Sequence, residues 1–180
     1  MAAVVEDVSN HKSDRVLNIL DRVERDLQKG LVTADIFADD DIFNLEMDRI
    51  FTRNWVFVAH ESEIPKPGDF VLRKLGLDSV LVTRGDRGEI NVISNLCRHR
   101  GAAICESDSG NARAFTCPFH GWSFKNNGDW IGAPHKSKAY KSLDPKAWGL
   151  LRAPRVETFR GMIFACLSAD RPSLRESLAG

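Results

Sequence analysis

The chain has 180 residues with 25 basic and 25 acidic side chains, so its formal net charge is zero. This balance argues against a nucleic-acid partner or an anionic membrane surface, because both favour a basic excess. No apolar run approaches the ~18 residues that a transmembrane helix needs. The first residues also lack the basic start and apolar core of a secretory signal. The sequence therefore predicts a globular protein of the cytoplasm with no nucleic-acid or membrane partner.

Two helices are expected near the start of the chain. Residues 1–12 show no hydrophobic period and are expected to fray. Apolar residues at helical spacing predict a first helix over Ser13–Lys29, and Gly30 suits its left-handed end. A second helix is expected over Asp41–Thr52. The acidic residues 39–41 are interpreted as capping groups, since negative charge is favoured at a helix N-terminus.

After Arg53 the pattern changes to short runs rich in Val, Ile and Leu, separated by turn signals. The sequence Asn126-Asn127-Gly128 predicts a hairpin, because Asn and Gly tolerate positive φ. Residues 132–146 are polar and expected to form a loop, and Ser173 is expected to start a last short helix. The strands are expected at 55–59, 70–75, 79–84, 90–95, 115–117, 122–125, 150–159 and 162–167.

These elements predict an α+β protein that is mainly antiparallel β. So many short strands at close spacing favour a small β-sandwich or barrel, preceded by N-terminal helices. Three divisions are expected: a helical segment over residues 1–52, a β domain over 53–167, and over 168–180 the start of a linker or helix.

Two mixed pairs of metal-ligating residues lie in tight loops. Cys97 and His99 form a C-x-H pair, and 17 residues later Cys117 and His120 form a C-x₂-H pair. Thiolate and imidazole suit both iron and zinc, but a single tetrahedral zinc usually takes longer C-x₂₋₄-C and H-x₃₋₅-H pairings. Mixed pairs fit a Rieske-type [2Fe–2S] cluster, in which two cysteines hold one iron and two histidines hold the other. A zinc site stays the alternative.

Written as CRHRG and CPFHGW, this pattern resembles the large (α) subunit of Rieske non-haem iron aromatic-ring-hydroxylating dioxygenases. Three flanking segments also resemble that family. The resemblance covers roughly residues 35–170 and implies that the β domain is a Rieske [2Fe–2S] domain. The flanking segments are Ile50–Trp55, Ile64–Asp69 and Val156–Gly161.

The resemblance implies an electron path. A ferredoxin would deliver electrons to the cluster held by Cys97, His99, Cys117 and His120, with His120 as the exit ligand. The acceptor would be a mononuclear iron in a neighbouring α subunit, which supports O₂-dependent dihydroxylation of an aromatic compound. The implied assembly is an α trimer, in some cases with a small β subunit.

The chain does not carry the second iron site that this resemblance implies. Its remaining histidines, His11, His60 and His135, form no close pair, so the catalytic residues are expected in a catalytic domain beyond residue 180. The chain alone is expected to transfer electrons and to hydroxylate nothing. A free-standing Rieske-type ferredoxin is a further alternative.

The Rieske proteins of respiratory and photosynthetic cytochrome complexes carry an extra disulfide between the two cluster loops. This chain has Ala102 and Phe119 at the corresponding places, which disfavours that class.

Several residues near the ligands have simpler interpretations. Arg98 and Arg100 flank the first pair and are interpreted as charge compensation or as a docking point for an acidic partner. Trp122 is expected to pack in the core, with shielding of the cluster as the alternative. Cys105 and Cys166 are expected to be structural.

Overall fold

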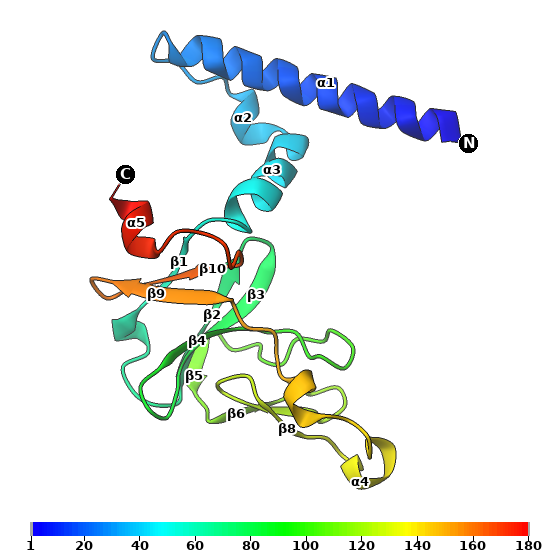
Figure 1. Ribbon diagram of the computed structural model, residues 1–180, viewed down its shortest axis with the longest axis vertical. Coiled ribbons are helices and arrows are strands. Elements are labelled where there is room, and N and C mark those ends of the chain that lie inside the picture. The colour runs from blue at the N-terminus through cyan, green and yellow to red at the C-terminus, as the bar shows by residue number, and fades with distance from the viewer. Residues whose placement is uncertain (1, 180) are drawn as a thin grey trace. The chain divides into compact units, whose positions relative to one another are not determined.

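The computed structural model describes residues 2–179, and it describes side chains from residue 14 onward (Figure 1). The chain divides into two compact units, residues 1–50 and residues 51–180. None of the described helices has the length and the apolar character that a membrane span requires.

The first unit is helical. It contains α1 (Ala2–Leu27), α2 (Asp35–Ala38) and α3 (Asp40–Glu46), and α3 continues into a π-helical turn over Met47–Phe51. The expectation that residues 1–12 fray was wrong, because α1 begins at Ala2; this segment contains no Pro or Gly to stop a helix. The second expected helix is divided, since its last turn is π-helical. The helix α1 ends at Leu27, and Gly30 in the turn after it adopts the expected left-handed conformation, with a φ of +71°.

Asp39 joins helices of the first unit. Its carboxylate accepts the backbone N–H groups of Asp41 (3.0 Å) and Ile42 (3.2 Å), which caps α3, and it pairs with Arg15 of α1. The interpretation of the acidic run as capping is thereby confirmed for Asp39. The N–H of Ile42, followed by the charge of Arg15, lowers the pKa of the buried Asp39 carboxyl.

We expect this cap to make the helical unit sensitive to acid. A carboxyl whose pKa is lowered by folding stabilises the fold above its unfolded pKa, and that stabilisation is lost as the pH falls through the folded value. Helical circular dichroism should therefore decline as the pH falls below about 4. Asp39→Asn keeps a capping oxygen but cannot titrate. It should be less stable at pH 7, and its helical signal should depend less on pH; an unchanged pH dependence would contradict the assignment.

The second unit is built from ten strands among the described residues, and every strand pair is antiparallel. The three sheets have the strand orders β1-β10-β9, β4-β3-β2-β5 and β6-β7-β8. The strands are β1 (Val56–His60), β2 (Asp69–Leu75), β3 (Asp78–Arg84), β4 (Ile90–Ser94), β5 (Ser109–Asn111), β6 (Ala114–Thr116), β7 (Ser123–Lys125), β8 (Trp130–Gly132), β9 (Arg155–Phe159) and β10 (Met162–Cys166).

The four-stranded sheet is the middle layer, because its two faces belong to different cores. Alternate residues of a strand point to opposite faces. On β3, Leu81 packs with the residues of β6-β7-β8, whereas Val80 and Val82 pack with β1 and β10. On β4, Ile93 likewise packs in the core with β6-β7-β8, and Val92 packs in the core with β1 and β10. The expected antiparallel sandwich is therefore confirmed, and the middle sheet is buried on both sides.

The predictions for the second unit were wrong at three places, two of them strands and one a loop. The strand β5 has the sequence Ser-Gly-Asn, which carries no hydrophobic alternation. Residues 150–154 form only a single bridge, between Ile93 and Arg152, since Pro154 has no N–H for a ladder. The expected loop over 132–146 contains α4 (Lys136–Ala139), and a 3₁₀ turn follows over Pro145–Trp148.

The predicted hairpin is confirmed. It joins β7 to β8, and Gly128 adopts a φ of +91° while its N–H donates to the Lys125 carbonyl at 2.8 Å.

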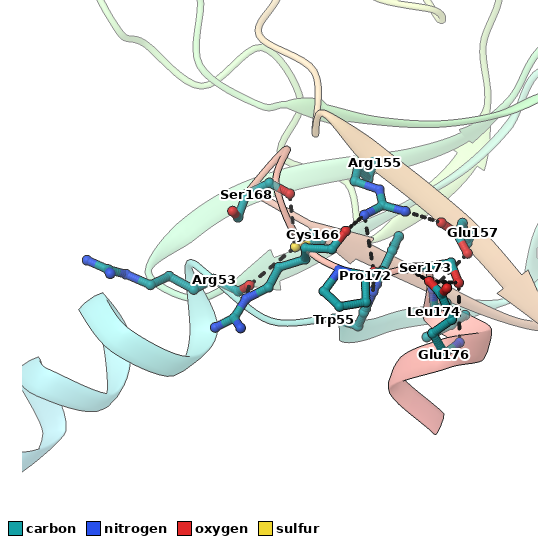
Figure 2. Close-up of polar contacts among 11 residues, drawn as sticks. Arg53, Trp55, Arg155, Glu157, Cys166, Ser168, Pro172, Ser173, Leu174 and Glu176 are labelled. Carbon is teal, nitrogen blue, oxygen red and sulfur yellow. Dashed lines mark hydrogen bonds and ion pairs between the residues drawn. The ribbon is translucent and has the colours of Figure 1, made fainter. Parts of the chain in front are cut away.

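A polar cluster ties the C-terminal segment to the β1-β10-β9 sheet (Figure 2). Arg155 of β9 lies with its guanidinium 4.9 Å from the Trp55 ring centroid, and it donates to the Glu157 carboxylate (2.8 Å) and the Pro172 carbonyl (3.1 Å). The indole N–H of Trp55 donates to that same carbonyl at 3.0 Å. Glu157 also accepts the N–H of Leu174 at 2.9 Å. One ion pair and one indole thus hold the start of the last helix.

That last helix is α5 (Leu174–Leu178), and it starts as expected at Ser173. The Ser173 hydroxyl accepts the Glu176 N–H, while the Glu176 carboxylate accepts the Ser173 N–H at 2.8 Å. This reciprocal pair forms a capping box (Figure 2).

Candidate metal centre

The two predicted ligand pairs lie on loops with matching backbone turns. The first loop follows β4, and the second connects β6 to β7. In the first, the N–H of Cys97 donates to Ala102 and the N–H of Gly101 returns to Cys97, both at 2.8 Å. In the second, Cys117 donates to Trp122 at 2.8 Å and Gly121 returns to Cys117 at 3.0 Å. Each cysteine is therefore held by the same turn, closed by a glycine four residues later.

These glycines are required by their backbone conformation. Gly101 has a φ of +74° and Gly121 a φ of +70°, which is left-handed backbone that favours glycine. A Cβ atom on Gly121 would also lie 2.8 Å from Cγ of Pro134.

The structure brings the four predicted side chains together at the tips of these loops. The rings of His99 and His120 lie edge to face with centroids 4.8 Å apart. Cys97 and Cys117 are both buried, His99 is partly buried, and His120 is exposed. The group thus has an inner end made of sulfur and an outer end made of imidazole.

The electrostatics of Cys97 follow from this arrangement. Burial raises the pKa of its thiol, and the adjacent Cys117 raises it further, while the backbone N–H groups of His99 and Arg100 act in the opposite direction. Two buried thiols in contact disfavour ionisation, whereas a bound metal ion removes their protons. The N–H groups directed at the sulfur are the donors that a thiolate ligand uses.

An unpaired buried nitrogen also supports a [2Fe–2S] cluster at these residues. The Nδ1 atom of His99 is buried and has no hydrogen-bond partner among the described residues, and buried polar nitrogens are normally satisfied. A metal ion at Nδ1 would satisfy it. Among the described residues no three Cys, His, Asp or Glu side chains group around a point that suits a single ion. A [2Fe–2S] cluster needs only two protein ligands at each iron.

Trp122 stacks on the imidazole ring of His99. Its indole is 1% exposed and lies parallel to the His99 ring, with centroids 5.2 Å apart and planes 10° apart. The rings of Trp130, Tyr140 and Trp148 surround the indole at 5.3–5.6 Å. The expected packing role of Trp122 is confirmed, and the stack on His99 links that packing to the site.

Sequence reasoning missed Asn95, which closes the base of the first loop. Its side-chain amide donates to the Cys105 carbonyl (2.8 Å) and to Ser79 (3.2 Å), and its carbonyl oxygen accepts the Cys105 N–H at 3.0 Å. Asn95 is 2% exposed. Because residues 95 and 105 bracket Cys97 and His99, this one amide holds both ends of the ligand loop. A polar residue directly after a strand, next to a ligand pair, was the available signal.

Replacing Asn95 by leucine should loosen the ligand loop. Each buried backbone group left without a partner costs about 1–3 kcal/mol, so the melting temperature should fall and a chelator should remove iron faster. Asn126→Leu is the matched control, since Asn126 is also buried and bonds the Arg84 carbonyl at 3.2 Å, in a hairpin without ligands. Equal iron loss from both variants at equal destabilisation would contradict the proposal that Asn95 holds the ligand loop closed.

The remaining predicted residues are placed as follows. Arg98 lies with its guanidinium 5.9 Å from the Trp148 ring centroid, and Arg100 is exposed. Cys166 is fully buried and Cys105 partly buried, and all four cysteines are unpaired, so no disulfide joins the loops. Phe119, next to the second histidine, is 73% exposed.

Neither His60 nor His135 belongs to these loops. His60 caps a 3₁₀ turn over Glu61–Glu63, where its Nδ1 accepts the Ser62 N–H at 3.2 Å. His135 is exposed, at the start of α4. Both are structural or surface residues, as expected.

Residues 54–159 match the model of the Rieske [2Fe–2S] domain. The chain belongs to the Rieske [2Fe–2S] domain family, and it corresponds to the N-terminal Rieske portion of an aromatic-ring-hydroxylating dioxygenase α subunit.

Three similar proteins define this correspondence. The α subunit of N,N-dimethyl phenylurea N-demethylase from Sphingobium sp. (strain YBL2) is 59% identical over 89% of this chain and 35% of that protein. The α subunit of biphenyl 2,3-dioxygenase from Rhodococcus jostii (strain RHA1) is 44% identical over 83% of this chain and 32% of that protein. The crystal structure of naphthalene 1,2-dioxygenase from Rhodococcus sp. bound to indole is 37% identical, with a TM-score of 0.86, over 93% of this chain and 38% of that one. The chain thus spans about a third of the length of these relatives.

Proposed function

We propose that Cys97, His99, Cys117 and His120 hold a Rieske [2Fe–2S] cluster, and that the chain is the electron-transfer portion of an oxygenase α subunit. The two cysteines would bind one iron and the two histidines the other. The observation that carries this proposal is the pair of matched loops, which deliver one thiol and one imidazole each to a common point.

A bound [2Fe–2S] cluster supplies one-electron transfer, at a potential that histidine ligation raises above that of an all-cysteine cluster. The chain's own residues set the environment. Burial of Cys97 and Cys117 keeps water from the sulfur end, and the loop N–H groups stabilise negative charge there. His120 is the exposed ligand and is therefore the proposed exit toward an acceptor.

The rest of the proposal concerns the whole protein, in the cytoplasm. A ferredoxin would be the electron donor, and a mononuclear iron of a neighbouring α subunit in a trimer would be the acceptor. In some cases the assembly would include a small β subunit. We assign residues 1–52 to an N-terminal helical segment, 53–167 to the Rieske domain, and 168–180 to the start of a linker toward a catalytic domain.

The proposed reaction is O₂-dependent dihydroxylation of an aromatic compound. A second candidate is oxidative N-demethylation of an aromatic N-methyl compound. It is supported by the higher sequence identity to an N-demethylase subunit, 59%, against 44% to a biphenyl dioxygenase subunit. The full-length oxygenase, supplied with ferredoxin, reductase and O₂, separates these. Formaldehyde release from N,N-dimethyl phenylurea supports the second candidate, and a dihydrodiol from biphenyl supports the first.

The cluster itself is tested on the chain purified without added metal. Iron and acid-labile sulfide in equal amounts, with a Rieske-type paramagnetic signal on reduction, support the proposal. A colourless, zinc-loaded product would instead support a structural zinc domain. The reading frame after codon 180 separates the oxygenase from a free-standing Rieske ferredoxin: a histidine pair and a later aspartate indicate the oxygenase.

A further inference from the structure

The neutral chain hides a strong separation of charge. Residues 1–50 carry twelve acidic and six basic side chains, whereas residues 51–180 carry thirteen acidic and nineteen basic ones. The basic excess is concentrated in residues 112–153, which contain seven basic and only two acidic side chains. Both of those carboxylates have partners, because Asp129 pairs with Arg152 and Asp144 accepts the N–H of Lys146.

The centre of this region is a segment that we name the basic strap, residues 133–148. It contains four lysines and one acidic residue, Asp144, and all four lysines are exposed. They are Lys136, Lys138, Lys141 and Lys146.

The basic strap lies against both ligand loops. Pro134 packs on Gly121 of the second loop, closely enough that a Cβ there would clash. At the other end of the strap, Trp148 lies under the guanidinium of Arg98 in the first loop. Between them, Tyr140 contacts Trp122, the residue that stacks on His99. A molecule seated on this strap is therefore next to the cluster site.

We propose that the basic strap is the docking surface for an acidic electron-donor protein. The inference rests on the proposed function and adds to it the place and the charge of the donor. Complementary charge between two proteins mainly raises their association rate. Exposed Arg100, on the first ligand loop, adds to the same potential.

The acidic N-terminal unit of a second copy is the competing occupant. Four of its carboxylates pair with basic side chains of their own unit: Asp39 with Arg15, Asp35 with Arg22, Asp26 with Lys29 and Asp48 with Arg49. The strap also lies against both ligand loops, where an electron donor has to approach, and this position favours a separate acidic donor protein over a second copy.

The test compares two double charge reversals. Lys138→Glu/Lys141→Glu inverts the strap, whereas Lys74→Glu/Arg175→Glu places the same charge change on β2 and α5. Both pairs are exposed, and none of the four contacts the ligand loops through any of the interactions described above. Stopped-flow absorbance then follows reduction of the chain's cluster by a reduced acidic [2Fe–2S] ferredoxin.

At low salt the strap variant should react at least about tenfold more slowly than the wild type, since steering changes association rates by 10–10³. The difference should vanish near 0.5 M salt, where the Debye length is only about 4 Å. The control variant should stay within about twofold of the wild type. Equal slowing in both variants, or no slowing in the strap variant, would overturn the inference.

A second measurement needs no partner protein. Ferricyanide and hexaammineruthenium(III), which carry opposite charges, are each used to oxidise the reduced cluster. The strap variant should slow the anionic oxidant relative to the cationic one, and unchanged relative rates would count against a positive local potential.

Two further measurements distinguish failure of the proposed function from failure of the docking inference. The paramagnetic signal of each variant is recorded first, so that absence of a cluster in the wild type refutes the proposed function and not merely the strap. Sedimentation velocity is then compared: if the wild type self-associates and only the strap variant dissociates, the occupant is a second copy and the inference is overturned.

Discussion

Cys97→Ser is expected to yield a folded chain that has lost its [2Fe–2S] cluster. A serine hydroxyl is nearly the size of a thiol but does not ionise near neutral pH, so one iron loses a ligand. Loss of even an outer partner of a metal ligand costs 10–100-fold in affinity. Bound iron and acid-labile sulfide should therefore fall at least about tenfold, with loss of the visible absorption and the paramagnetic signal.

The chain supplies its own control in Cys166→Ser. Cys166 is also fully buried, and its thiol donates to the Ser168 carbonyl at 3.3 Å, in β10 and away from both ligand loops. This variant should keep its iron and sulfide. Cys105→Ser, in the first ligand loop but outside the ligand set, should keep them as well. Full iron content in Cys97→Ser, or equal loss in all three variants, would refute the ligand assignment.

The candidate ligand pairs were predictable because their spacing is local. Cys97 and His99, like Cys117 and His120, lie within four residues of each other, and a turn alone places such residues on one loop. Most strands were predictable for a related reason, since a run of β-branched and other apolar residues between turn signals is also local, as in Val80–Val82 of β3. Local pattern thus carried both the fold class and the four candidate ligands.

What surrounds the site could not be predicted, because it is made by contacts between distant segments. Trp148 reaches Arg98 and Trp122 from across fifty and twenty-six residues respectively. Neither a hydrophobic period nor a turn signal reports such a contact, so residues 132–146 looked like a plain polar loop. The role of Asn95 was missed for the same reason, since its side chain closes the ligand loop through hydrogen bonds to Cys105 and Ser79, which are distant in the sequence.

The same distant contacts explain why the site is held firmly by residues that bind no metal. Trp122 collects packing from Trp130, Tyr140 and Trp148 and presents one face to His99. The stack fixes the plane of the imidazole, and a ligand whose rotamer is fixed loses less entropy when it binds. We therefore expect Trp122 to affect stability and cluster retention together.

Trp122→Ala is expected to destabilise the chain by about 3–5 kcal/mol, as other large-to-small core changes do, and to speed removal of iron by a chelator about tenfold. Urea unfolding measures the first effect and loss of visible absorption measures the second. Trp122→Phe keeps an aromatic face against His99 and should retain iron almost as well as the wild type. If Trp122 only filled space in the core, this recovery would not be expected.

Phe124→Ala separates the stack from general softening of the core. Phe124 is fully buried in the same cluster, its ring centroid lies 6.4 Å from that of Trp122, and it is not in ring contact with His99. Its loss belongs to the same class of core change and should cost a similar 3–5 kcal/mol. If the stack matters, Phe124→Ala will release iron at nearly the wild-type rate under conditions where both variants are folded. Equally fast release from both would show that core stability, and not the ring on His99, holds the ligand.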